Sequence, residues 1–303
     1  MSNNIFVLVD FSKDIGNGHL NRVNSLLHNL ETDELEIQKI IINNENKNNL
    51  LKTINLNSFE KSSLKLLLID SFILSDKTII FLSKFFKNVL IIDDWIGRKL
   101  YGNNIYILDW TALADRSPIH SNHKKLEKFF GIEYCPIKIE KNFSKTNDFL
   151  IYLGSNIKIN IYIDIIKHLL KEYPKKNIIV INKNIKEVKK VFPKNQNLSF
   201  LDFQNENNFR KCLLSTEYFI SIGGWSCYQA IAAGSCPLLI SLDDSNTYFD
   251  CYGIIFAGYG EAFGYIDEQG NLKITKKELN LKNNHYSRHD IGKKLKILNK
   301  ILK

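Results

Sequence analysis

Residues 5–30 read IFVLVDFSKDIGNGHLNRVNSLLHNL and join a strand to a helix through a glycine-containing turn. The first five of these residues form an apolar, largely β-branched run, which is typical of a buried strand. From Leu20 to Leu30, apolar residues recur at helical spacing. Gly18 and His19 lie where this helix begins, and there glycine permits close backbone approach while helix N–H groups are unpaired. The sequence therefore predicts a ligand-binding corner between the first strand and the first helix.

The first half of the chain continues this alternation of strands and helices. Further strands are predicted at 36–43, 64–70, 88–94 and 104–109, and helices at 19–30 and 76–87. These strands are near-continuous apolar runs, which indicate a parallel sheet covered on both faces. In open α/β sheets, ligands bind beyond the carboxyl ends of the strands. Acids that end the predicted strands are therefore expected to gather at one edge: Asp10, Asp70, Asp93, Asp94 and Asp109.

A polar stretch at 140–148 interrupts the pattern, and the alternation then restarts. We predict two domains, residues 1–143 and 144–303, each with a doubly wound parallel sheet. The expected fold class is α/β, with two Rossmann-like domains that face each other across a cleft. In the second domain, strands are predicted at 148–154, 177–182, 198–203, 217–222 and 237–242, and a helix at 160–172.

The last residues, 291–303, have the pattern of an amphipathic helix with lysines opposite an apolar stripe. We assign this helix to the second domain as a closing element that packs on the protein body. Peripheral contact with a membrane surface is the alternative interpretation.

The net charge is +9, from 41 Lys and Arg against 32 Asp and Glu, and the lysines are spread along the whole chain. A diffuse excess suits anionic small molecules, and it lacks the clustered arginines of a nucleic-acid groove. No apolar run approaches the about 18 residues of a membrane-spanning helix, and no secretory signal is recognisable. The five cysteines include no CxxC pair, so we expect a cytoplasmic protein without a disulfide framework.

A second informative stretch, residues 221–237, reads SIGGWSCYQAIAAGSCP. It places a strand, a Gly223-Gly224 turn and a short helix in succession. Backbone N–H groups at the start of that helix can hold a pyrophosphate, and the helix dipole favours the negative charge.

Together these stretches resemble the bacterial UDP-sugar hydrolase family of pseudaminic acid synthesis (UDP-2,4-diacetamido-2,4,6-trideoxy-β-L-altropyranose hydrolase). This family is related to the glycosyltransferases of GT-B fold. The most specific similarity is the pattern DxSxxIGxGHxxR at residues 10–22. Supporting similarities are spread over residues 5–255, at 68–70, 92–94, 131–134, Lys138, 152–155 and the Gly223-Gly224 turn.

The resemblance implies a GT-B fold, with the nucleotide held mainly by the C-terminal domain. It also implies that His19 faces the glycosidic carbon of a nucleotide-activated amino sugar, where a neutral imidazole can take a proton from water. Other residues that it implies for the substrate are Asp10, Gly16, Gly18, Arg22, Asp70, Phe72 and Asp94. Those that it implies for the nucleotide are Gly154, Ser155, Gly223, Gly224, Trp225, Ser226, Gln229 and Asp244.

Two alternatives stay open for individual residues, one for Arg22 and one for Asp93 and Asp94. Arg22 contacts a phosphate or carboxylate of the substrate, or it pairs with a nearby acid. Asp93 and Asp94 form an acid/base pair, or one of them points inward and the other outward. His120 and His123 lie in a loop-like segment without a third Cys or His, so we expect no metal and no cofactor.

The sequence departs from the family pattern at Phe72, where a tyrosine is usual, at Gln229 in place of a glutamate, and at Asp243 and Asp244. These departures keep two other functions open beside inverting hydrolysis of a UDP-sugar. One is a GT-B glycosyltransferase that acts on a saccharide acceptor, with a CMP-activated nonulosonic acid as a candidate donor. The other is an inactive protein that binds a nucleotide sugar.

Overall fold

The computed structural model describes residues 4–11, 18–30, 36–43, 64–93, 97–117, 120, 126–138, 144–154, 157–193, 195–202, 206–242, 245–275 and 290–301. The chain divides into two compact units. Unit 1 comprises Met1–Ile137 and Asp290–Lys303, and unit 2 comprises Lys138–His289. No helix in the described ranges has the length and apolar character needed to span a bilayer.

Unit 1 is built on a six-stranded sheet in the order β2-β1-β3-β4-β5-β6, and every pairing in it is parallel. The strands are β1 (Asn4–Asp10), β2 (Glu36–Ile42), β3 (Leu64–Asp70), β4 (Asn88–Ile92), β5 (Ile105–Asp109) and β6 (Glu127–Phe130). The first five confirm the predicted strands. β6 lies in a segment for which we predicted no element, because four residues of mixed polarity give no clear strand pattern.

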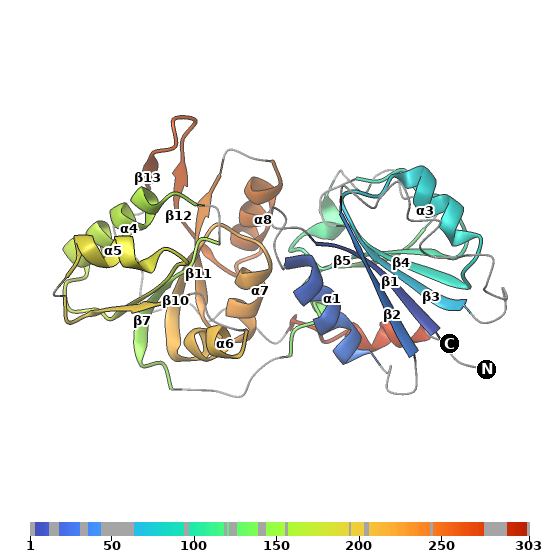
Figure 1. The fold of residues 1–303 in the computed structure, drawn as a ribbon, viewed down its shortest axis with the longest axis horizontal. Helices are drawn as coiled ribbons and strands as arrows, with labels where there is room; N and C mark the ends of the chain where they lie inside the picture. Colours follow the sequence, from blue (N-terminus) through green and yellow to red (C-terminus); the bar gives the residue numbers. More distant parts are fainter. Residues whose placement is uncertain are drawn as a thin grey trace. The chain divides into compact units, whose positions relative to one another are not determined.

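Helices α1 (Gly18–Asn29) and α3 (Asp76–Ser83) lie on opposite faces of this sheet (Figure 1). Side chains alternate between the two faces of a strand. One set, including Phe6, Leu8 and Leu67, forms a buried core with Ile79 and Leu82 of α3. The parallel sheet is therefore covered on both sides, as its continuous apolar strands predicted.

Unit 2 contains a seven-stranded sheet in the order β13-β12-β11-β10-β7-β8-β9. Its strands are β7 (Asn147–Ile151), β8 (Ile178–Ile181), β9 (Leu198–Leu201), β10 (Thr216–Ser221), β11 (Cys236–Ser241), β12 (Glu261–Ile266) and β13 (Leu272–Ile274). Only the β12–β13 pairing is antiparallel. The five predicted strands are confirmed, and β12 and β13 extend the sheet beyond them.

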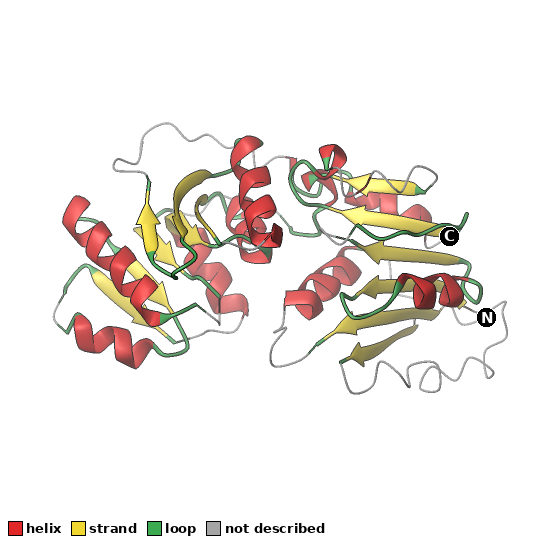
Figure 2. Ribbon diagram, turned by 90° about the horizontal axis from the view of Figure 1, so that it is seen from above, coloured by secondary structure: helices red, strands yellow, loops and turns green. Residues whose placement is uncertain are grey.

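The helices of unit 2 cover both faces of its sheet, and Figure 2 shows them in red beside the yellow strands. They are α4 (Ile159–Glu172), α5 (Ile185–Val191), α6 (Glu206–Ser215), α7 (Trp225–Ala232) and α8 (Ser245–Phe256). The largest buried core joins α4 and α5 to one face of the strands, through residues such as Tyr162, Ile166 and Phe149. Two Rossmann-like units in one chain confirm the predicted α/β class.

The C-terminal segment differs from its prediction in both form and place. It forms the 3₁₀ helix η7 (Leu295–Ile301) and belongs to unit 1, not to the second domain. Ile291, Leu295, Leu298 and Ile301 are buried. The Asn88 side chain donates to the carbonyl of Ile301 over 2.6 Å. The segment thus packs on the protein body, as expected. It packs on unit 1, however, whereas we predicted that it belongs to the second domain.

Candidate active site

In each sheet, the order in which successive strands are added reverses at one point. In doubly wound folds, ligands bind at this switch point. In unit 1, β1 lies between β2 and β3, so the segments that follow β1 and β3 leave the sheet at this switch point. In unit 2 the corresponding pair is β7 and β10. The turns that carry His19, Phe72, Gly154 and Gly223 follow these four strands. The predicted site residues therefore cluster at the switch point of each unit.

His19, Arg22 and Asp70 form one buried cluster at the carboxyl edge of the unit 1 sheet. His19 and Arg22 lie on successive turns of α1 and are 7% and 8% exposed, and Asp70 ends β3 with no exposure. His19 Nδ1 lies 2.6 Å from Asp70 Oδ1, and Arg22 Nε donates to Asp70 Oδ2 over 2.5 Å. Arg22 Nη2 also donates to Asp70 Oδ1. The alternative that Arg22 pairs with a nearby acid is therefore the one observed.

The charge of Asp70 fixes which ring nitrogen of His19 carries the proton. Burial on its own would raise the pKa of Asp70, but the Arg22 charge and the hydrogen bonds from Arg22 and His19 outweigh it and lower the pKa below its usual value. An ionised carboxylate only accepts hydrogen bonds, so Nδ1 must donate. In the neutral ring, the lone pair is then on Nε2, which is the nitrogen able to accept a proton.

A rigid turn holds Phe72 against His19. Asp10 at the end of β1 accepts hydrogen bonds from the Ser71 hydroxyl and from the backbone N–H of Phe72, each over 2.5 Å. Asp10 has no exposure, so its carboxylate cannot touch a substrate directly. Its effect on the site comes from the turn that it holds in place. The Phe72 ring is 47% exposed and meets the His19 ring edge-on, with centroids 4.6 Å apart. An aromatic face thus adjoins the imidazole.

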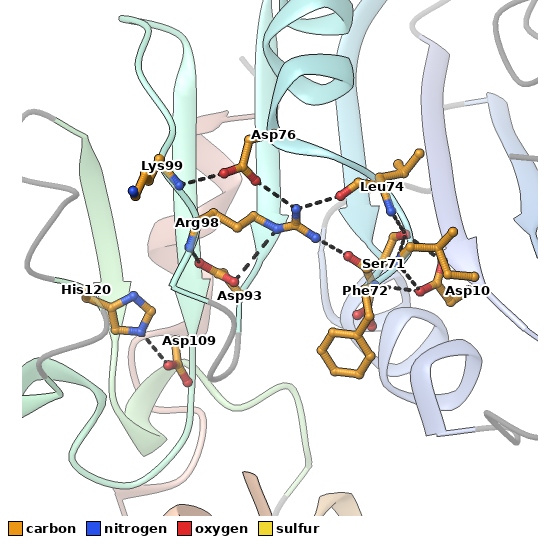
Figure 3. Close-up of polar contacts among 12 residues, drawn as sticks. Asp10, Ser71, Phe72, Leu74, Asp76, Asp93, Arg98, Lys99, Asp109 and His120 are labelled. Atoms are coloured by element: carbon orange, nitrogen blue, oxygen red, sulfur yellow. Dashed lines mark hydrogen bonds and ion pairs between the residues drawn. The ribbon is translucent and has the colours of Figure 1, made fainter. Parts of the chain in front are cut away.

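Arg98 supports the same turn from the other side (Figure 3). Its guanidinium donates to the carbonyls of Ser71 and Leu74, and it forms ion pairs with Asp76 at 3.1 Å and Asp93 at 3.8 Å. Burial raises the pKa of Asp93 to about 6, against the opposing effect of Arg98. Asp93 is thus buried and belongs to the support of the site.

Asp109, a further acid at this edge, contacts His120. Asp109 Oδ2 lies 2.7 Å from His120 Nε2, and Asp109 Oδ1 accepts hydrogen bonds from the backbone and hydroxyl of Thr111. Within the described ranges, no group of three or more His, Cys, Asp or Glu is arranged to hold a metal ion.

In unit 2, the Gly223-Gly224 turn precedes α7 and is held by Asp250 of α8. Both glycines have positive φ, 97° and 80°. Asp250 accepts hydrogen bonds from the backbone N–H of Gly224 and, over 2.7 Å, from the Tyr228 hydroxyl. Because the first N–H groups of a helix have no helical acceptor, this turn presents α7 as a site for an anion.

The other predicted residues fall into two groups. Gly18 begins α1, Gly154 follows β7 with a φ of 81°, and Trp225, Ser226 and Gln229 lie on α7. A Cβ on Gly18 or Gly154 would meet nothing within 4 Å, so each leaves open space at its switch point. Four predicted residues lie outside the described ranges: Gly16, Asp94, Ser155 and Asp244.

An open hollow of about 630 Å³ lies in unit 2 near the ends of β11 and β12. Its lining combines aromatic, acidic and amide groups, among them Tyr248, Tyr265, Asp267 and Gln269. Tyr248 and Tyr265 are about half exposed, at 52% and 45%. The sequence did not reveal this hollow, because most of its residues come from α8, from β12 and from the turn after β12, and neither of these two elements was predicted.

Three supporting residues were also missed: Trp110, which lies under the Arg22 guanidinium at 5.6 Å, together with Arg98 and Asp250. Each acts through a partner far away in the chain, and a single sequence carries no signal for such a pairing. Trp110 directly follows Asp109, the acid that ends β5, and this position near the predicted edge was the only sequence signal for any of the three.

Comparison with known proteins identifies the fold. Neither a family model nor a curated protein matches the sequence. Among solved structures, UGT89C1 of Arabidopsis thaliana aligns with 99% of this chain and 94% of its own, at a TM-score of 0.64 and 8% identity. The fold is of the GT-B type.

Two further structures have the same fold. The UDP-GlcNAc 2-epimerase of Methanocaldococcus jannaschii matches over 99% of both chains, with a TM-score of 0.53 and 12% identity. The calicheamicin glycosyltransferase CalG4 matches over 86% of this chain and 85% of its own, with a TM-score of 0.53 and 9% identity. Identities this low establish the architecture and leave the reaction to be argued from the site.

Proposed function

We propose that this protein is an enzyme that cleaves the glycosidic C–O bond of a nucleotide-activated amino sugar by inverting hydrolysis, with His19 as the base. The observation that carries the proposal is the buried His19–Asp70 pair, in which Nδ1 donates to a carboxylate and Nε2 is left as the proton acceptor. The resemblance of residues 10–22 to the UDP-sugar hydrolases of pseudaminic acid synthesis, in which the corresponding histidine is the base, supports it.

In the proposed reaction, Nε2 of His19 takes a proton from water as its oxygen attacks the anomeric carbon. The bond from that carbon to the diphosphate oxygen breaks, and the nucleoside diphosphate leaves with the electron pair. Attack from the side opposite the leaving group inverts the anomeric centre. The low exposure of His19 keeps bulk water from competing for its hydrogen bonds. The exposed ring of Phe72 is suited to the apolar face of a deoxy sugar.

We assign nucleotide binding to Gly154 and to the Gly223-Gly224 turn with the start of α7. Helix N–H groups favour the growing charge of the leaving diphosphate, so the reaction needs no metal for this step. Gln229 is assigned to a ribose hydroxyl. The solved structures of similar fold include complexes with UDP, with UDP-L-rhamnose and with UDP-GlcNAc, which is consistent with a nucleotide in this fold.

The test is release of UDP from UDP-activated diacetamido-trideoxy sugars. We expect turnover by the wild type, and a loss of about 10²- to 10⁴-fold in His19→Gln. His28→Gln is the matched control, because His28 is exposed on the same helix. Activity in His19→Gln equal to that in His28→Gln would remove His19 from the reaction.

Glycosyl transfer is the second candidate, and the hollow lined by Tyr248 and Tyr265 favours it. Tyrosine rings with nearby carboxylate and amide groups suit a saccharide acceptor, and the volume is that of a small-molecule site. Nucleotide release that requires an added saccharide would select transfer over hydrolysis, with UDP- and CMP-activated donors tested side by side. Nucleotide binding without turnover of any donor would indicate a binding protein.

A further inference from the structure

The cluster at His19 contains a contact between two groups that both donate hydrogen bonds. Arg22 Nη2 lies 3.0 Å from His19 Nδ1. Neither nitrogen can accept from the other, because Nδ1 carries the proton it gives to Asp70 and a guanidinium has no acceptor. The two nitrogens are close because both donate to the same atom, Asp70 Oδ1.

This contact places a permanent positive charge beside an imidazole that is to act as a base. A carboxylate next to histidine stabilises the protonated ring, and a ring already protonated at neutral pH cannot take a proton from water. The Arg22 guanidinium opposes that effect in two ways. It neutralises the charge of Asp70, and its own charge repels a proton on His19.

We propose that Arg22 is a positioning residue that keeps His19 neutral at working pH and fixes its Nδ1–H tautomer, instead of contacting a substrate phosphate. The relevance of this role to turnover rests on the proposed function. The electrostatic role itself is a property of the cluster and is measurable without a substrate.

The surroundings of Arg22 hold its charge in place. The residue is 8% exposed, its two hydrogen bonds to Asp70 form a fork, and its guanidinium lies over the Trp110 ring. Among the described residues, the charged groups within hydrogen-bond distance of His19 are Asp70 from β3 and Arg22 from α1. The Asp10 carboxylate at the end of β1 is engaged by the turn at Ser71 and Phe72.

The direct test is NMR of the full chain labelled with ¹⁵N-histidine, recorded as a function of pH. The two ring nitrogens report the tautomer and the protonation of each histidine, and His19→Gln identifies the signals of His19. In Arg22→Met we expect the midpoint of the His19 titration to rise by about one to three pH units. Arg22→Lys retains a charge and should return the midpoint toward that of the wild type. An unchanged midpoint in Arg22→Met overturns the proposal.

A second comparison avoids leaving Asp70 buried without its partner, should Arg22→Met fail to fold. Asp70→Asn is compared with the double variant Asp70→Asn/Arg22→Met, which contains neither charge. The midpoint for His19 should be lower in Asp70→Asn, where Arg22 is unopposed, than in the double variant. Equal midpoints in the two would contradict the proposal.

Kinetics separate this role from a phosphate contact. If Arg22 holds His19 neutral, the acid limb of the pH profile of kcat/KM moves to higher pH in Arg22→Met. At pH values above this limb, the activity of Arg22→Met should approach that of the wild type. A phosphate contact would instead raise KM at every pH without moving the limb, and that result counts against the proposal. Arg116→Met, at an exposed arginine, is the control. A wild type inactive on every donor would refute the proposed function, while the NMR test would stand.

Discussion

Two of the buried acids at the carboxyl edge of unit 1 have pKa values shifted in opposite directions. Burial disfavours the charge of both Asp70 and Asp93. Asp70 has a forked arginine and a histidine in hydrogen-bond contact, whereas Arg98 approaches Asp93 Oδ1 only to 3.8 Å. The distance to the nearest cation therefore decides which acid stays ionised and which resists ionisation.

The raised pKa of Asp93 predicts a specific pH dependence of stability. Between about pH 4 and pH 6, the folded protein holds a proton that the unfolded chain has released, so stability falls as pH rises through this window. Asp93→Asn removes the effect. Its free energy of unfolding, relative to the wild type, should increase by about 3 kcal/mol from pH 4 to pH 7. Urea unfolding at several pH values measures this difference.

The control for this prediction is Asp115→Asn, which removes an exposed carboxylate and the same formal charge. A constant difference between Asp93→Asn and the wild type across the window would show that Asp93 ionises normally in the fold.

At this scale the sequence predicted positions well and partners poorly. Asp10, Asp70, Asp93 and Asp109 were expected at one edge, because the ends of parallel strands share an edge, and the structure confirms this. Their individual roles were not predictable. Asp10 and Asp93 support a turn through Ser71 and Arg98. These partners reach them only in the folded chain, so the sequence alone carried no sign of the contacts.

The turn before α7 shows how two adjacent glycines meet different constraints. A Cβ on Gly223 would lie 3.0 Å from Asp250 Oδ2 and 3.3 Å from Cys251 Sγ, whereas one on Gly224 would meet nothing within 4 Å. Both residues have positive φ, which disfavours any side chain. Gly223 therefore combines backbone strain with a steric conflict, and Gly224 has the strain alone.

We predict that Gly223→Ala destabilises the protein more than Gly224→Ala. Strain alone should cost about 1–2 kcal/mol in Gly224→Ala, and displacement of Asp250 should bring the loss in Gly223→Ala to about 3 kcal/mol or more. Urea unfolding measures both. Equal losses would mean that α8 adjusts to the added methyl group at little expense. A thermal-shift screen of both variants with UDP, CMP, GDP and dTDP then relates the turn to nucleotide binding.

Elements with long apolar runs were predictable, and short or irregular ones were not. The C-terminal segment illustrates the reason. Its apolar spacing predicted a regular helix from residue 291, but Gly292 has a φ of 67° and its N–H donates to the carbonyl of Ile132. The positive φ of Gly292 interrupts the helix at its start, and the tertiary hydrogen bond holds the backbone there. The spacing of apolar residues records which side chains are buried and does not report such a contact.

On the scale of the whole molecule, the return of the C-terminal segment to unit 1 ties the two ends of the described chain into one body. Backbone N–H groups of Gly292 and Lys294 donate to the carbonyls of Ile132 and Glu133, and Lys300 forms an ion pair with Glu127. Leu298 is 1% exposed within the same segment, whereas its neighbour Ile297 is 44% exposed.

We predict that Leu298→Ala destabilises unit 1 by about 2–5 kcal/mol, because it leaves a cavity in a packed site. Ile297→Ala is the matched control and should change stability by no more than about 0.5 kcal/mol. Hydrogen exchange followed by mass spectrometry locates the effect. Faster exchange in β4 and β5 with unchanged exchange in β7 and β10 is expected, and equal effects of the two variants would contradict this packing.

This return also sets an order of events during synthesis. A ribosome makes the strands of unit 1 first, yet the surface around Asn88 and Ile132 stays uncovered until residue 301 has emerged. Unit 2 is one continuous segment and can complete its core earlier. The half of the protein that is translated first is therefore the last to reach its final form, and a chain that stalls before residue 290 would expose an unfinished apolar surface to chaperones and proteases.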